Sequence, residues 1–348
     1  MVQKRKRLAL VVGILVVLTT FAYAQGTKEE AGSSTKKGEH ITFYASGPAA
    51  MLEKLEEVFE KEHGDVIDLV QMGCGPLRQR VWTEMQSGSI KADVFWGSDP
   101  LLFDALDKKG VLDGYVSKHS SAMKDEFLTD KNYTLVNERY GVIIYNGDKL
   151  QGDRVPRSYL DLLDPSLKGK ITHADPAQSS TALAIVASLW DMFGRDWSYQ
   201  TSLVKNGLFL ARKNSDVPSK IQEGEFDVGI APHDAVLRLQ KKAKMEGYPT
   251  PLMISWPEEG ALAIPRPVAI SKNASRSPEM QLVAQDFVDF LLSKQAQMIT
   301  ANSSFISVRK DVPLPQGIPG DLKVQRVNWD ELSEIQDTIR DEFTKISQ

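Results

Sequence analysis

The chain has 348 residues, of which 42% are hydrophobic and 25% charged, and its formal net charge is −4. An acidic chain of this kind is a poor partner for nucleic acid or for an anionic membrane surface. Its lone cysteine, Cys74, excludes an internal disulfide, so stability must come from packing.

The first 24 residues have the pattern of a cleaved signal peptide. Residues 4–7 are basic, residues 8–21 are apolar, and residues 22–24 give the small-x-small cleavage pattern. The apolar run is short for a membrane span of about 20 residues. Residues 25–39 are small, polar and charged, which predicts a flexible leader. Removing the four basic residues of the signal from a net charge of −4 leaves the mature chain at −8.

Three units of strand, small polar turn and helix follow the leader. The expected strands are residues 41–45, 66–72 and 92–96, and the expected helices are residues 48–63, a segment opening at 73–76, and residues 101–109. This alternation is typical of a parallel sheet covered by helices. Each strand then ends at a helix amino terminus, where free N–H groups and a partial positive charge favour anions.

A second group of elements repeats this arrangement. The expected strands are residues 139–145, 170–174, 226–231 and a long strand at 260–270, and the expected helices are residues 182–193, 235–242 and 281–299. A mature chain of roughly 310 residues is too long for one ordinary core and predicts two lobes.

A turn of three hydroxyl residues, Ser179, Ser180 and Thr181, precedes the helix at 182–193. Consecutive hydroxyls and backbone N–H groups at a helix start suit a phosphate. An ordinary helix cap needs only one of the three, so both interpretations stay open. Ser46 and Gly75 follow the first and second strands and offer similar donors from the facing lobe, because glycine lets a ligand approach the backbone closely.

Several segments together carry a resemblance to a known family. They are the opening ITFYASGP, the strand ADVFW, residues 140–146, the block DLLDP followed by LKGKI, residues 175–181, and Glu259-Gly260. Through them the chain resembles the bacterial extracellular solute-binding proteins of the ferric-ion and organophosphate group, the binding components of ABC importers. The DLLDP–LKGKI block is the most specific of these segments.

The resemblance implies an α/β, two-lobed periplasmic binding protein fold of type II, with discontinuous lobes joined by two hinge strands near residues 140–145 and 260–270. One lobe would comprise residues 40–139 plus 264–310, and the other residues 140–263 plus 311–348. Closure around a small anionic ligand would shift a population rather than catalyse a reaction. We therefore expect a periplasmic monomer that is not an enzyme, needs no cofactor, and delivers its ligand to an ABC permease in the inner membrane.

The ligand is predicted from one loop of the second lobe. Iron-binding members of the family carry adjacent tyrosines there, whereas this chain has Pro232-His233-Asp234-Ala235 and no tyrosine between Tyr199 and Tyr248. Ferric iron, which favours anionic oxygen ligands, is thus an alternative rather than the first choice, and no metal ligand is assigned.

A sugar-phosphate-binding branch of the family carries a His-Asp pair in this loop and an acidic residue about two dozen positions later. The matching residues here are His233, Asp234 and Glu258, and the resemblance implies that they bind a hexose 6-phosphate. Asn214, in the loop at 213–215, is expected to add one hydrogen bond. Structural roles for His233 and Asp234 stay open. A second alternative is 2-aminoethylphosphonate, with Glu258 and Glu259 holding the amine.

Overall fold

The computed structural model describes residues 38–273 and 275–348. The predicted signal peptide, residues 1–24, and most of the predicted leader lie outside these residues.

The first lobe is built on three parallel strands, β1 (His40–Ala45), β2 (Val66–Gln71) and β3 (Val94–Trp96). Each strand is followed by a helix: α1 (Ala49–His63), α2 (Cys74–Gln86) and α3 (Pro100–Lys108). Helix α1 buries Met51, Leu55 and Phe59, spaced four residues apart on one face. The predicted strand–turn–helix units are confirmed here.

The second lobe repeats this design. Its parallel strands are β6 (Ile171–Ala174), β7 (Phe209–Ala211) and β8 (Val228–Pro232). Its helices are α4 (Ser180–Met192), α5 (Ser198–Lys205), α6 (Asp216–Gln222) and α7 (His233–Glu246). The pattern missed β7, α5 and α6, which are only three to eight residues long.

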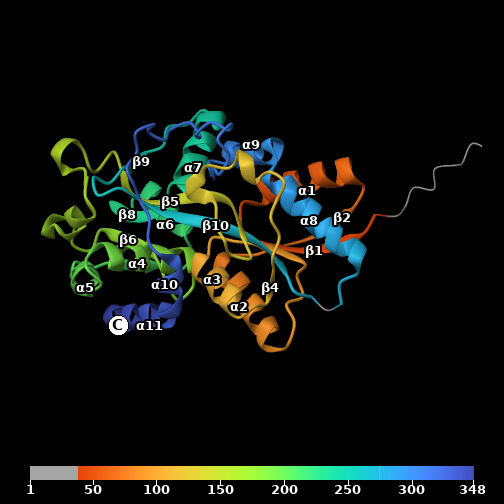
Figure 1. The fold of residues 1–348 in the computed structure, drawn as a ribbon. Helices are drawn as coiled ribbons and strands as arrows, with labels where there is room; N and C mark the ends of the chain where they lie inside the picture. The colour runs from red at the N-terminus through yellow and green to blue at the C-terminus, as the bar shows by residue number, and fades with distance from the viewer. Residues whose placement is uncertain (1–37, 274) are drawn as a thin grey trace, which may run out of the picture. The chain divides into compact units, whose positions relative to one another are not determined.

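Two long antiparallel strands, β5 (Thr134–Asn146) and β10 (Ala261–Ser271), join the lobes in one sheet of order β2-β1-β3-β10-β5-β8-β6-β7. They run through the middle of the structure, between the β1–β3 and β6–β8 strands (Figure 1). They are the predicted hinge strands, although the residue boundaries of the lobes stay a prediction. Shorter elements are β4 (Leu112–Asp113), β9 (Leu252–Ser255), β11 (Ile306–Ser307), β12 (Val324–Gln325) and 3-10 helices at Ser120–Ala122, Asp125–Phe127, Gly152–Arg154, Tyr159–Leu163 and Pro165–Leu167.

The long helix predicted at 281–299 is wrong in one respect, because the structure has two helices, α8 (Pro278–Leu292) and α9 (Lys294–Asn302). Ser293 between them has an extended backbone with ψ 156°. Its hydroxyl accepts a hydrogen bond from the N–H of Ala296 at 3.2 Å, which caps the second helix and ends the first.

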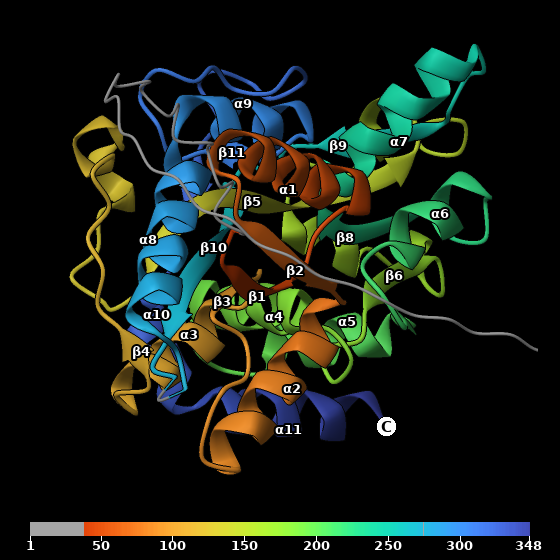
Figure 2. The ribbon, with the colours of Figure 1, turned by 90° about the vertical axis from the view of Figure 1, so that its right-hand side faces the viewer.

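The C-terminal helices α10 (Trp329–Glu334) and α11 (Gln336–Ser347) contact both lobes (Figures 1 and 2). Helix α10 packs on α3 of the first lobe, and α11 packs on α4 and α5 of the second. One apolar cluster joins the C-terminal segment to both lobes. In it Leu332, Ile339 and Phe343 pack with Leu101 of α3 and Leu183 of α4.

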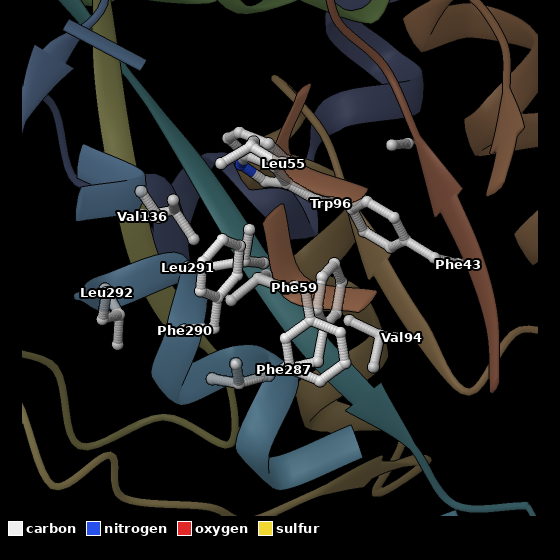
Figure 3. Packing of buried hydrophobic residues seen from close by; sticks show 14 of the residues in the cluster. Phe43, Leu55, Phe59, Val94, Trp96, Val136, Phe287, Phe290, Leu291 and Leu292 are labelled. Carbon is white, nitrogen blue, oxygen red and sulfur yellow. The ribbon is translucent and has the colours of Figure 1, made fainter. Parts of the chain in front are cut away.

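The core of the first lobe centres on aromatic rings from α1, β1 and α8 (Figure 3). The ring of Phe287 meets those of Phe43 and Phe59 edge to face, at centroid distances of 4.8 and 5.0 Å. We expect Phe287→Ala to lower the free energy of unfolding by about 3–5 kcal/mol, because it leaves a cavity in a close-packed core. Urea unfolding measures this loss. Leu282→Ala on the same helix, where the side chain is 62% exposed, should change stability by less than about 0.5 kcal/mol.

Candidate functional site

A cavity of about 670 Å³ lies where strands of both lobes end. It is lined by residues 46–48 after β1, residues 71–76 after β2, residues 178–179 after β6 and residues 212–215 after β7, together with Arg139, Ala235, Arg238 and Phe305. The carboxyl ends of parallel strands from two lobes thus face one space, which is where open α/β sheets bind ligands.

The two lobes touch at one side of this cavity. The hydroxyl of Ser180 donates to the carbonyl of Cys74 at 3.3 Å, and that of Thr181 donates to the carbonyl of Ser98 at 3.3 Å. A Cβ atom built on Gly75 would lie 2.3 Å from the carbonyl oxygen of Gln178. These contacts of the start of α4 with the turns that open α2 and α3 describe a closed arrangement of the lobes.

Two arginines from different elements share one buried carboxylate at the cavity wall. Arg139 of β5 donates from Nε and Nη2 to the two oxygens of Asp234, at 2.8 and 2.6 Å. Arg238, one turn along α7 from Asp234, donates to the same carboxylate. Burial alone would raise the pKa of Asp234, but the charges of Arg139 and Arg238 outweigh it and hold that pKa well below its usual range.

A third guanidinium lies behind the cavity. Arg266 of β10 is fully buried and donates to the Ser98 hydroxyl at 2.8 Å, to the Asn137 side-chain oxygen at 3.1 Å, and to the carbonyl of Ser46. All three acceptors are neutral, so they do not cancel its charge. Burial first, and then the charge of Arg139, lower the pKa of Arg266 below its ordinary value, and an arginine so placed is still protonated at neutral pH.

This group carries a net positive charge. Arg139, Arg238 and Arg266 contribute three positive charges, and Asp234 contributes one negative charge. This charge of two lies partly in the cavity wall, at Arg139 and Arg238, and partly behind it, at Arg266 and Asp234. Away from bulk water a hydrogen bond to an anion is stronger. Arg212 and Lys213 add two exposed cations at the rim.

Four of the residues predicted to bind the ligand line the cavity: Ser46, Gly75, Ser179 and Asn214. The hydroxyl oxygen of Ser179 accepts from the N–H of Ala182 at 3.3 Å and from the Asn214 side-chain amide at 2.6 Å. Ser179 therefore caps α4 and also lines the cavity, and its part in binding a phosphate stays a prediction. Ser180 and Thr181 instead lie at the contact between the lobes.

The structure does not bring the other three predicted residues to this cavity. His233 and Asp234 are fully buried, with Asp234 beneath Arg139 and Arg238. Helix α7 begins at His233, so Asp234 is not the cap of this helix. Glu258 is exposed in the loop between β9 and β10, where its backbone N–H donates to the carbonyl of Arg157.

A second cavity, of about 960 Å³, lies on the other side of the contact between α2 and α4, against the start of α11. It is larger, but its arginines are each paired. Arg78 contacts Asp99 at 2.9 Å, Arg80 contacts Glu84 at 3.0 Å, and Arg340 contacts Asp337 at 3.0 Å. The smaller cavity is the better anion site because its guanidiniums outnumber its carboxylates.

The sequence prediction missed Arg139 and Arg238. Arg139 opens the expected strand at 139–145 and pairs with a residue 95 positions away, so no local pattern marks it. Arg238 follows Asp234 by four positions on an expected helix, and this spacing does indicate a helical ion pair. That spacing was the available signal that Asp234 faces an arginine.

Burial lowers the pKa of His233 to about 4, from an ordinary value near 6.5. The unfolded chain therefore binds a proton at higher pH than the folded chain, and the contribution of neutral His233 is lost as pH falls from 6.5 towards 4. We expect the difference in unfolding free energy between wild type and His233→Gln to shrink by up to about 3 kcal/mol between pH 7 and pH 4, since each pKa unit is worth about 1.4 kcal/mol. Urea unfolding at several pH values measures it, and a constant difference would contradict the prediction.

Comparison with known proteins gives the family. Residues 89–334 match the model of the family described as bacterial extracellular solute-binding protein. A periplasmic protein of Salmonella typhi, provisionally named for binding 2-aminoethylphosphonate, is 28% identical over 265 residues, which cover 74% of this chain and 73% of the relative.

Two solved structures share the fold. The periplasmic binding protein AfuA of Actinobacillus pleuropneumoniae, solved with fructose 6-phosphate, has a TM-score of 0.77 at 22% identity, covering 89% of this chain and 98% of that one. Iron-bound HitA of Pseudomonas aeruginosa has a TM-score of 0.76 at 19% identity, covering 88% and 99%. These likenesses establish the two-lobed type II fold.

The chain therefore belongs to the bacterial extracellular solute-binding protein family and is a periplasmic solute-binding component of an ABC transporter. Within residues 38–273 and 275–348, no helix combines the length and the apolar character needed to cross a bilayer.

Proposed function

We propose that this protein captures a phosphorylated sugar, a hexose 6-phosphate, in the cavity between its lobes and delivers it to an ABC permease without altering it chemically. The observation that carries this proposal is the charge of the cavity wall. Arg139 and Arg238 line a space of about 670 Å³, and together with the buried Arg266 and Asp234 behind them they leave two positive charges. A phosphate monoester near neutral pH carries close to two negative charges, so it matches this group in charge.

The rest of the lining supports an organic phosphate rather than a metal ion. Among the described residues that line the cavity there is no carboxylate and no phenol. Ferric iron favours such anionic oxygen ligands. The lining instead offers neutral donors and acceptors suited to sugar hydroxyls, at Gln71, Gln178, Asn214 and Ser215.

A second candidate is 2-aminoethylphosphonate, because relatives 27–28% identical are provisionally named for binding it. Its phosphonate would suit the same guanidiniums. Its ammonium group favours a carboxylate, and the described lining supplies only amide, hydroxyl and carbonyl oxygens for it. The cavity therefore favours the hydroxyl-rich ligand.

Calorimetry with the mature protein tests the proposal. The ligands are glucose 6-phosphate, fructose 6-phosphate, the free hexoses, inorganic phosphate, 2-aminoethylphosphonate and ferric citrate. We expect a hexose 6-phosphate to bind more tightly than its free sugar and than inorganic phosphate, because both ends of the ligand contribute. Absence of heat and of any thermal shift with every hexose phosphate would reject the proposal.

A further inference from the structure

The adjacent residues His233 and Asp234 are both fully buried at the start of α7, directly behind the cavity wall. Neither lines the cavity. We propose that they are positioning residues, which hold the anion-binding side chains in place and do not touch the solute. This inference rests on the proposed function only in taking Arg139 and Arg238 as the groups that hold the anion.

Asp234 fixes two guanidiniums at once. Its carboxylate receives both Nε and Nη2 of Arg139, at 2.8 and 2.6 Å, which sets the plane of that guanidinium. The same carboxylate receives Nη1 of Arg238. Without it, two like charges would face each other at the cavity wall and move apart. The shared carboxylate therefore keeps two cations close together and pointing at one space.

His233 acts on the position of Phe305 through the backbone of the preceding residue. Its Nδ1 accepts the backbone N–H of Tyr140 at 2.8 Å, and its Nε2 donates to the carbonyl of Ser304 at 2.8 Å. Ser304 has a φ of 69°, a conformation that residues other than glycine rarely adopt. The hydrogen bond from His233 thus holds a strained turn immediately before Phe305.

The ring of Phe305 is the point where the guanidiniums meet. Its centroid lies 4.3 Å from the guanidinium carbon of Arg266, 5.5 Å from that of Arg139 and 5.9 Å from that of Arg238. The faces of aromatic rings attract cations at such distances. Three like charges can therefore gather around one ring, and His233 controls where this ring sits.

Positioning and direct contact with sugar hydroxyls predict different effects of Asp234→Asn on affinity. They differ in whether affinity rises or falls and in which ligands are affected. Asp234→Asn makes the cavity more positive, so charge alone predicts tighter binding of anions. Loss of a contact to hydroxyls predicts weaker binding of hexose phosphates only. Loss of positioning predicts weaker binding of every phosphate ligand by a common factor, because each uses the same guanidiniums.

The test measures dissociation constants of fructose 6-phosphate, 2-aminoethylphosphonate and inorganic phosphate for wild type, Asp234→Asn and His233→Gln. We expect Asp234→Asn to weaken all three by a common factor of about 10–100. His233→Gln should weaken all three by a smaller common factor, because glutamine can still donate to Ser304. Asp93→Asn is the matched control: Asp93 is only 3% exposed and pairs with Arg276 at 2.9 Å, but does not line the cavity. It should leave all three constants unchanged.

Three outcomes would overturn the inference: a loss confined to fructose 6-phosphate, an unchanged affinity, or tighter binding by Asp234→Asn. Should Asp234→Asn fail to fold, Asp234→Glu keeps the charge but moves the carboxylate, and the same common loss is expected. Wild type that binds inorganic phosphate but no hexose phosphate would reject the proposed sugar phosphate and leave this inference standing. Wild type that binds none of the three anions would reject both.

Discussion

Replacing Arg139 by glutamine should weaken the binding of a hexose 6-phosphate by roughly 30-fold to several thousandfold. Arg139 is 9% exposed and holds two bonds to Asp234, so its guanidinium is fixed before the ligand arrives. Losing one partner of a desolvated, hydrogen-bonded charge pair costs about 2–5 kcal/mol, and each 1.4 kcal/mol is tenfold in affinity. The substitution also leaves Asp234 with one fewer cation near an incoming anion.

Isothermal titration of wild type and Arg139→Gln measures the effect, and Arg276→Gln provides the control. The Arg276 side chain is 3% exposed and pairs with Asp93 at 2.9 Å, so its loss should lower stability. It does not line the cavity, so the affinity of the folded protein should stay the same. An Arg139→Gln variant with the affinity of wild type would show that the anion is held elsewhere.

Replacing Gly75 by alanine should hold the lobes apart. The added Cβ would lie 2.3 Å from the carbonyl oxygen and 3.1 Å from the carbonyl carbon of Gln178, and both of these are backbone atoms of the facing lobe. Neither can rotate away, so the lobes must separate. Gly75 lies in the first turn of α2, where alanine is a better helix former, so the fold itself should not be weakened.

We expect Gly75→Ala to lower ligand affinity by about tenfold or more, because the closed form that holds the ligand becomes less populated. Small-angle scattering should show compaction of wild type on addition of a hexose 6-phosphate and less compaction of the variant. Gly320→Ala is the control, since a Cβ atom there would meet no atom within 4 Å and Gly320 does not line the cavity. Equal affinity of Gly75→Ala and wild type would mean that ligand binding does not need this contact.

The strand–turn–helix units were predictable because each is encoded within about 25 consecutive residues. The run after β1 is an example, since Ser46-Gly47-Pro48 and the apolar spacing of α1 lie side by side in the chain. The order of the strands was accessible only through the family resemblance. The break at Ser293 was missed because a serine within an amphipathic pattern caps a helix only when its backbone is extended, and this depends on packing.

The candidate site was predictable in part. Residues at strand ends, such as Ser46 and Ser179, could be placed from the sheet edge alone. The burial of His233 and Asp234 behind the cavity could not be predicted, because the sequence shows which groups they carry and not how far they lie from the surface. Their proposed role depends on Arg139, which the pairing of β5 with β8 brings against Asp234. A contact between residues 95 positions apart is set by the tertiary fold, and local spacing carries no trace of it.

The C-terminal helices add a third connection between the lobes. Two crossing strands alone would let the lobes swing with little resistance. Here Leu332 and Phe343 fill a common apolar cluster with Leu101 of one lobe and Leu183 of the other. Any lobe movement that separates α3 from α4 must expose this apolar surface to water, at a free-energy cost of about 25 cal/mol for each Å² exposed. The last twenty residues of the chain therefore stabilise the arrangement in which α3 and α4 lie together, although they contribute no residue to the two crossing strands.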